Sequence, residues 1–288
     1  ALDRVLRFVE ETHVIRSDGQ RELSDVTQIG REVIEEFERL RSLRGMSGIP
    51  SGWPTLDRNT HGFQRGDLIV FSARPGIGKS TVAIKLALEA HRAGRIPLLV
   101  SMEMGRVQVG ARLMAMDRGL NLQTLRHGEL TSCATHHLED SITHFSNSQP
   151  FYLIEGQFRQ SVHDLASLVH SLRPDILIVD GAYLLKLPGA SSRMAQWEKI
   201  GEITQILKNI ISTANIPGIA TYQINREGGR RDRAGLQDTG LEHLQLSDAI
   251  GQLASLNVAI LSDEGGDSSD ASRQRRMKIL KGREGESG

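Results

Sequence analysis

The chain has 288 residues, of which 39% are hydrophobic and 24% charged, a composition that fits a folded globular protein and excludes a disordered chain. Thirty-five basic residues balance thirty-five acidic ones, so the net charge gives no sign of a nucleic-acid partner. The single cysteine, Cys133, excludes an intramolecular disulfide framework and a cysteine-based zinc site, and it fits a reducing compartment.

We expect neither a membrane-spanning segment nor a signal peptide in this sequence. No apolar run approaches the roughly 20 residues that span a bilayer, so we expect no membrane partner. The opening ALDRVLRFVEE is too charged for a signal peptide. Because the sequence begins with Ala1 rather than Met, we expect a fragment or a processed chain.

An amphipathic helix is predicted before the main domain. Residues 28–44, QIGREVIEEFERLRSLR, place apolar side chains on one helical face. The following segment, RGMSGIPSGWPTLD (residues 44–57), changes to Gly, Ser and Pro and indicates a linker or a loop that enters the main domain. We therefore predict two parts, a helical linker segment at residues 1–46 and one large domain at residues 47–288.

From residue 67 the sequence alternates between buried strands and helices. Continuous apolar runs, rather than alternating ones, are typical of parallel strands that are covered on both faces. The last run, RRMKILKGR, predicts an edge strand after a polar hairpin. The prediction is an α/β fold, a mostly parallel twisted sheet flanked by helices. The strand candidates are DLIVFSA, IPLLVSME, PFYLIEG, PDILIVDG, PGIATYQ and LNVAILSD.

The first of these strands leads into a candidate phosphate-binding loop, FSARPGIGKST. The general pattern is G-x-x-x-x-G-K-[ST], and Ala73 holds the position of the first glycine. Lys79 would reach the β- and γ-phosphates, Ser80 would offer its hydroxyl to Mg²⁺, and the helix that follows would direct its positive end at the phosphates. We expect ATP or GTP to be cradled by eight residues: Arg74, Pro75, Gly76, Ile77, Gly78, Lys79, Ser80 and Thr81.

Two acidic residues follow other predicted strands. Asp180 ends DILIVD, where a carboxylate can hold Mg²⁺ through water, and Glu103 follows LLVSM, where it can polarise the attacking water. The carboxyl ends of parallel strands share one edge of a sheet, so Lys79, Glu103 and Asp180 are expected around one crevice.

With these residues in place, the chain resembles the DnaB-type replicative DNA helicases of bacteria and phages, which are RecA-like ATPases. The lead-in SGIPSGWPTLDRNTHGFQRGDLIVFSARPGIGKST (residues 47–81) is similar to that family's own segment, including Ala73 at the first loop position. The resemblance continues through LVSMEM, ILIVD, TYQINR and ILKGREG and covers most of residues 47–288. It implies a RecA-like P-loop core, with the amphipathic N-terminal segment as the family's linker and its N-terminal domain absent from this chain.

The resemblance also implies roles for individual residues. Glu103 corresponds to the family's catalytic glutamate and Gln223 to the glutamine that senses the γ-phosphate. Lys281 and Arg283 correspond to a lysine-x-arginine pair that enters the ATP site of the neighbouring subunit, with Arg283 as the arginine finger. The alternative without a functional role is that this pair belongs to a solvent-exposed basic strand.

Two basic segments are candidates for contact with single-stranded DNA. KLPGASSRMAQW follows Asp180, and NREGGRRDRAG follows Gln223. Their charges can bind phosphates without reading sequence. The alternative is a solvated loop in each case. The candidate DNA-binding residues are Lys186, Arg193, Arg226, Arg230, Arg231 and Arg233.

The resulting hypothesis is a ring-shaped motor that hydrolyses ATP with Mg²⁺ at subunit interfaces, moves along single-stranded DNA and unwinds the replication fork. The resemblance implies a homo-oligomer, expected to be a hexamer, primase and helicase-loader partners, and a cytoplasmic location in a bacterium or in a phage's host. The first alternative is an ATPase of the RecA or KaiC class that forms rings or filaments without unwinding DNA. A second is a nucleotide-switched loading platform.

Overall fold

The computed structural model describes residues 25–42, 46–156, 160–191, 193–223, 248–262 and 274–282. The chain divides into two units, residues 1–45 and 46–288. The described part of the first unit is one helix, α2 (Val26–Ser42), which confirms the predicted amphipathic helix with bounds two residues earlier. None of the helices in the described ranges has the length and apolar character needed to cross a membrane.

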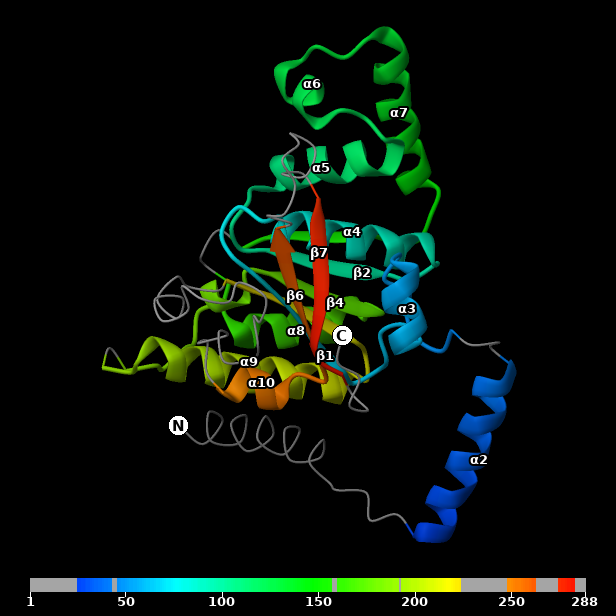
Figure 1. Ribbon diagram of the computed structural model, residues 1–288, viewed down its shortest axis with the longest axis vertical. Coiled ribbons are helices and arrows are strands. Elements are labelled where there is room, and N and C mark those ends of the chain that lie inside the picture. Colours follow the sequence, from blue (N-terminus) through cyan, green and yellow to red (C-terminus); the bar gives the residue numbers. More distant parts are fainter. Residues whose placement is uncertain are drawn as a thin grey trace, which may run out of the picture. The chain divides into compact units, whose positions relative to one another are not determined.

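The second unit is built on a seven-stranded sheet with helices on both faces (Figure 1). The strand order is β3-β2-β4-β5-β1-β6-β7, and every neighbouring pair is parallel except β6 and β7. This arrangement confirms the predicted α/β fold. In chain order the elements are α3 (Pro54–Thr60), β1 (Leu68–Ala73), α4 (Lys79–Arg92), β2 (Pro97–Ser101), α5 (Arg106–Arg118), α6 (Leu122–His127), α7 (Ser132–Ser146), β3 (Tyr152–Glu155), α8 (Val162–Leu172), β4 (Ile176–Asp180), η1 (Ala182–Leu184), α9 (Gln196–Ala214), β5 (Gly218–Gln223), α10 (Asp248–Leu253), β6 (Leu256–Ser262) and β7 (Arg275–Lys281).

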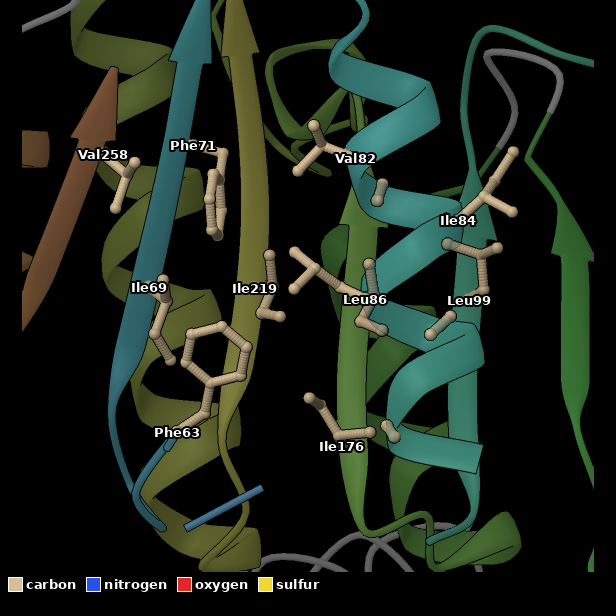
Figure 2. Packing of buried hydrophobic residues seen from close by; sticks show 14 of the residues in the cluster. Phe63, Ile69, Phe71, Val82, Ile84, Leu86, Leu99, Ile176, Ile219 and Val258 are labelled. Carbon is tan, nitrogen blue, oxygen red and sulfur yellow. The ribbon is translucent and has the colours of Figure 1, made fainter. Parts of the chain in front are cut away.

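The core consists of two apolar layers, one on each face of the sheet. Successive strand residues point to opposite faces, so Ile69 and Phe71 of β1 pack with α3, α4 and α5, whereas Leu68 and Val70 pack with α8, α9 and α10. Figure 2 shows Leu86 of α4 lying over the sheet beside Ile219. Because both faces are covered, the central strands are apolar at most of their positions, which explains the continuous runs in the sequence.

The segment predicted as a linker or loop at residues 44–57 contains the start of a helix. Pro54 occupies the first helical position of α3, where its fixed φ suits a helix and its missing N–H is not needed. The buried Asp57 accepts hydrogen bonds from the backbone N–H groups of Ser51 (2.7 Å) and Gly52 (3.2 Å). These bonds fold the Gly- and Ser-rich stretch against the domain.

Helices α5, α6 and α7 form an excursion between β2 and β3 that extends beyond the sheet (Figure 1). Asp117 of α5 accepts hydrogen bonds from Ser141 of α7 (2.7 Å) and Arg92 of α4 (3.2 Å). Burial alone would raise the pKa of Asp117, but these hydrogen bonds and the charges of Arg118 and Arg92 outweigh it and hold the pKa below its usual range. The ionised carboxylate therefore joins three helices.

Candidate nucleotide site

The loop between β1 and α4 has the backbone of a phosphate cradle. Gly76 has φ 77° and Gly78 has φ 109°, conformations that glycine adopts without the cost of a Cβ. Helix α4 begins at Lys79, and no side chain caps its first turn. Its unsatisfied N–H groups and the positive end of its dipole are therefore available to an anion.

Side chains from distant elements hold this loop. Arg275 of β7 donates from Nε to the carbonyl of Ile77 (3.1 Å), and Arg112 of α5 donates to the Thr81 hydroxyl (3.5 Å). Lys79 is 6% exposed. Neither arginine was found by sequence reasoning, because each lies far along the chain and no motif includes it.

Asp180, at the end of β4, is 2% exposed and is fixed by the neighbouring strand β5. Thr221 donates from its hydroxyl to Oδ1 of Asp180 (2.9 Å) and accepts from the backbone N–H of Gly181 (2.8 Å). Burial is the main reason that the pKa of Asp180 is raised; the hydroxyls of Ser80 and Thr221 and the charge of Lys79 oppose this shift, and Glu103 adds to it.

The same carboxylate fits a magnesium ligand. Among the described residues, no group completes a hydrogen bond to the buried Oδ2 of Asp180. An unpartnered buried oxygen near a serine hydroxyl matches the oxygen ligands that Mg²⁺ prefers. Within the described ranges there is no cluster of three or more His, Cys, Asp or Glu side chains arranged for a metal. A bound Mg²⁺ would therefore take its other ligands from phosphate and water.

Glu103 and Gln223 are linked by a third side chain that sequence reasoning missed. The Tyr183 hydroxyl, from η1, donates to Oε1 of Glu103 and lies 3.1 Å from Oε1 of Gln223. Glu103 is exposed and lines an open cavity of about 820 Å³ between the start of α5 and the end of β3. The only sequence signal for Tyr183 was a polar aromatic residue three positions after Asp180.

Strand order brings these groups to one edge. Strands β2, β4, β5 and β1 are successive neighbours, with Ser101 paired to Asp180 and Ala73 paired to Gln223. Glu103 follows β2, and the phosphate loop follows β1. The structure thus places the phosphate loop, Asp180, Gln223 and Glu103 at one edge of the sheet, while their roles stay predictions.

Lys281 lies at the opposite edge of the sheet. Because β7 is antiparallel, Arg275 pairs with Ser262 near the phosphate loop, whereas Lys281 pairs with Asn257 at the amino edge. The Lys281 ammonium donates to the backbone carbonyls that end α10, at Gly251 (2.8 Å), Gln252 (3.1 Å) and Ala254 (2.8 Å). Seven strand residues separate the two edges by about 20 Å.

Two of the candidate DNA-binding residues can be located. Lys186 and Arg193 are exposed on the segment between η1 and α9, and the backbone of Lys186 bonds to Gln160 and Val162. The remaining predicted residues lie outside the described residues: Arg226, Arg230, Arg231, Arg233 and the predicted arginine finger, Arg283.

Comparisons with known proteins identify relatives along most of the chain. Replicative DNA helicase DnaB of Helicobacter pylori is 30% identical over 220 residues, and replicative DNA helicase DnaC of Bacillus subtilis is 30% identical over 227 residues. Each alignment covers 75% of this chain but only 44% and 49% of the respective relative. The chain therefore spans less than half the length of these curated relatives.

Solved structures give the same fold. One structure, described as an ATPase domain, has a TM-score of 0.79 and 26% identity, covering 92% of this chain and 94% of that one. A DnaB-like replicative helicase, described with its interactions with primase, has a TM-score of 0.76 at 24% identity and covers 96% of this chain and 67% of its own. The first match confirms the predicted RecA-like fold.

Residues 48–288 match the family described as the DnaB-like helicase C terminal domain. This match covers the sheet, the phosphate loop and every strand-end residue discussed above. Family membership implies nucleotide binding and ATPase activity. The chain belongs to the DnaB-like helicase C-terminal domain family.

Proposed function

We propose that this chain is the motor of a ring-shaped replicative DNA helicase, which hydrolyses ATP between subunits and uses the energy to move along single-stranded DNA and unwind the duplex. Residues 1–46 would serve as the linker and residues 47–288 as the motor. Primase and a helicase loader are the proposed partners, with a hexamer as the proposed assembly.

Nucleotide binding is assigned to the phosphate loop. The loop at residues 74–81 would surround the phosphates with its backbone N–H groups, to which Pro75 contributes none, and the Lys79 ammonium would neutralise the β- and γ-phosphate charge. Ser80 and Asp180 would hold Mg²⁺, which when bound neutralises charge that develops on the phosphate oxygens. The unpartnered Oδ2 of Asp180 supports this assignment.

Hydrolysis is assigned to the next two strand ends. Glu103 would accept the proton of the attacking water, because it is an exposed carboxylate directly after β2. Gln223 would contact the γ-phosphate, so that the chain after β5 responds to the presence of that phosphate. A displacement of Gln223 would then be transmitted along the chain to residues 224–247, which include the proposed DNA-binding arginines.

The observation that carries the ring hypothesis is the direction of β7. Lys281 stands about 20 Å along the strand from its own phosphate loop, farther than a lysine side chain reaches. If Lys281 and Arg283 act on ATP, they act in the site of another subunit. An arginine supplied in this way contributes about 10³–10⁵ in rate. Lys281 would then have to leave the α10 carbonyls.

The test is ATP hydrolysis measured at several protein concentrations, with and without single-stranded DNA. We expect turnover per subunit to rise steeply with concentration, to increase with DNA, and to vanish in Lys79→Ala. Arg283→Ala should match Lys79→Ala in hydrolysis while retaining nucleotide binding. A forked duplex in the same samples then measures unwinding.

Two outcomes would contradict parts of the proposal. Turnover per subunit that is independent of concentration, in a sample that sizing shows to be monomeric, would rule out the trans site. DNA-independent hydrolysis by assembled rings, with no unwinding, would favour the ATPase of the RecA or KaiC class instead.

A further inference from the structure

The Tyr183 hydroxyl stands between the two residues to which hydrolysis is assigned. Its ring follows Asp180 by three residues, and the chain turns at Gly181, which has φ 85°. The N–H of Gly181 is bonded to Thr221 of β5, so the turn that carries Tyr183 is anchored to the strand that ends in Gln223. The position of the hydroxyl is therefore set by both β4 and β5.

The chemistry of this hydroxyl allows it to bind both neighbours at once. It has one proton, which goes to the Glu103 carboxylate, and lone pairs that accept. A half-turn of the Gln223 amide puts its NH₂ against the same oxygen, so that Gln223 donates to Tyr183 while Tyr183 donates to Glu103. Each bond polarises the next in such a chain.

We propose that Tyr183 is a positioning residue that couples the γ-phosphate sensor Gln223 to the proposed base Glu103. This inference rests on the proposed function of the site and adds its regulation. A displacement of Gln223, whether by phosphate or by the segment that follows it, changes the orientation of Glu103 through one hydroxyl. The DNA-binding arginines proposed at residues 226–233 begin three residues after Gln223. A displacement of Gln223 on DNA binding would therefore change the orientation of Glu103 through the same Tyr183 hydroxyl.

The environment of Tyr183 keeps the hydroxyl protonated. Burial, the hydrogen bond to Glu103, and the charges of Glu103 and Asp180 all raise the pKa of Tyr183. The phenol is thus a neutral donor at every pH at which the motor works. A phenylalanine fills the same space without this donor, which makes Tyr183→Phe the direct perturbation.

The experiment compares Tyr183→Phe with a matched control, Tyr152→Phe, in the full chain. Tyr152 begins β3 at the amino edge of the sheet, away from the site. ATPase activity is measured over a range of ATP, with and without single-stranded DNA, and ADP affinity is measured as a check on folding. For Tyr183→Phe we expect the DNA-stimulated kcat to fall about tenfold, the size expected for losing one hydrogen bond to a charged group, with KM and ADP affinity within about twofold. Tyr152→Phe should leave kcat, KM and ADP affinity unchanged.

A double-mutant cycle isolates the coupling. If Tyr183 acts between Gln223 and Glu103, then Tyr183→Phe added to Gln223→Ala should lower kcat by less than about twofold further, because the connection is already broken. A merely structural loss at Tyr183 would instead multiply with the effect of Gln223→Ala.

The possible results separate this inference from the function on which it rests. Loss of hydrolysis in Glu103→Gln and Gln223→Ala together with an unchanged Tyr183→Phe overturns the role of Tyr183 alone. Full additivity in the cycle, or a Tyr183→Phe effect confined to KM, also overturns it. Hydrolysis that is absent from the unaltered chain, or unaffected by Glu103→Gln, overturns the proposed function and the inference with it.

Discussion

Replacing Thr221 with valine should weaken both the fold and the proposed magnesium site. The two side chains have nearly the same shape, so the change removes the hydroxyl and little else. That hydroxyl makes two buried hydrogen bonds, donating to Asp180 (2.9 Å) and accepting from the N–H of Gly181 (2.8 Å). Thr221 is completely buried, so no water replaces the lost partner.

The magnitude follows from the two groups that lose their partner. A hydrogen bond to a charged group contributes about 1.5–3 kcal/mol, and a buried N–H left unsatisfied costs about 1–3 kcal/mol. We expect Thr221→Val to lower the free energy of unfolding by about 3 kcal/mol, which corresponds to a Tm lower by roughly 6–12 °C for a unit of this size. The loss of one of the hydroxyls that oppose the effect of burial should also raise the pKa of Asp180 further and weaken Mg²⁺-dependent ATP binding.

Thermal unfolding followed by circular dichroism, with and without Mg-ATP, measures both effects. Thr221→Ser is the matched control, since it keeps the hydroxyl and loses one methyl group. The valine variant should lose more stability than the serine variant and gain less from Mg-ATP. Equal Tm values for the two variants would refute the assignment of the stability to the hydroxyl.

Three further predictions use other contacts of the structure. Asp117→Asn should lower the free energy of unfolding by about 2 kcal/mol at neutral pH, measured by urea unfolding. Because the pKa of Asp117 is lowered in the folded state, the difference between the two proteins should persist above about pH 4. It should disappear as the pH falls through the folded-state pKa. Lys281→Met should lower the free energy of unfolding of the isolated subunit by about 1–2 kcal/mol, because three carbonyls at the end of α10 lose their cation. An unchanged urea midpoint would argue against this contact. Glu103→Gln should lower the pKa of Tyr183 but leave it above its usual value, because burial remains the largest cause; the tyrosine Cζ carbon signal, assigned with Tyr183→Phe, reports this titration.

The phosphate loop could be predicted from the sequence because its determinants are contiguous. Gly76, Gly78, Lys79 and Ser80 act through one turn, and the strand before them and the helix after them are visible as an apolar run and a helical pattern. The same locality explains why Asp180 was found at the end of an apolar run. The α/β fold followed because strands covered on both faces have a continuous apolar pattern.

The supporting residues could not be predicted, because strand order decides which of them meet. Thr221 lies 41 residues from Asp180 in sequence, and only the adjacency of β4 and β5 brings its hydroxyl to the carboxylate. Arg275 is 198 residues from Ile77 and meets it because β7 runs antiparallel. Helix α3 was missed for a different reason: the stretch before it is held by backbone N–H groups that donate to the buried Asp57, a contact that composition does not reveal.

The two ends of the antiparallel strand β7 contact different parts of the domain. Its first residue, Arg275, holds the Ile77 carbonyl in the phosphate loop of its own subunit. Its last residue, Lys281, holds the end of α10 at the other edge of the sheet. If Lys281 and Arg283 enter the site of the next subunit, β7 connects the phosphate loop of one ATP site with the finger of another. Nucleotide state in one subunit would then bias its neighbour without any additional element.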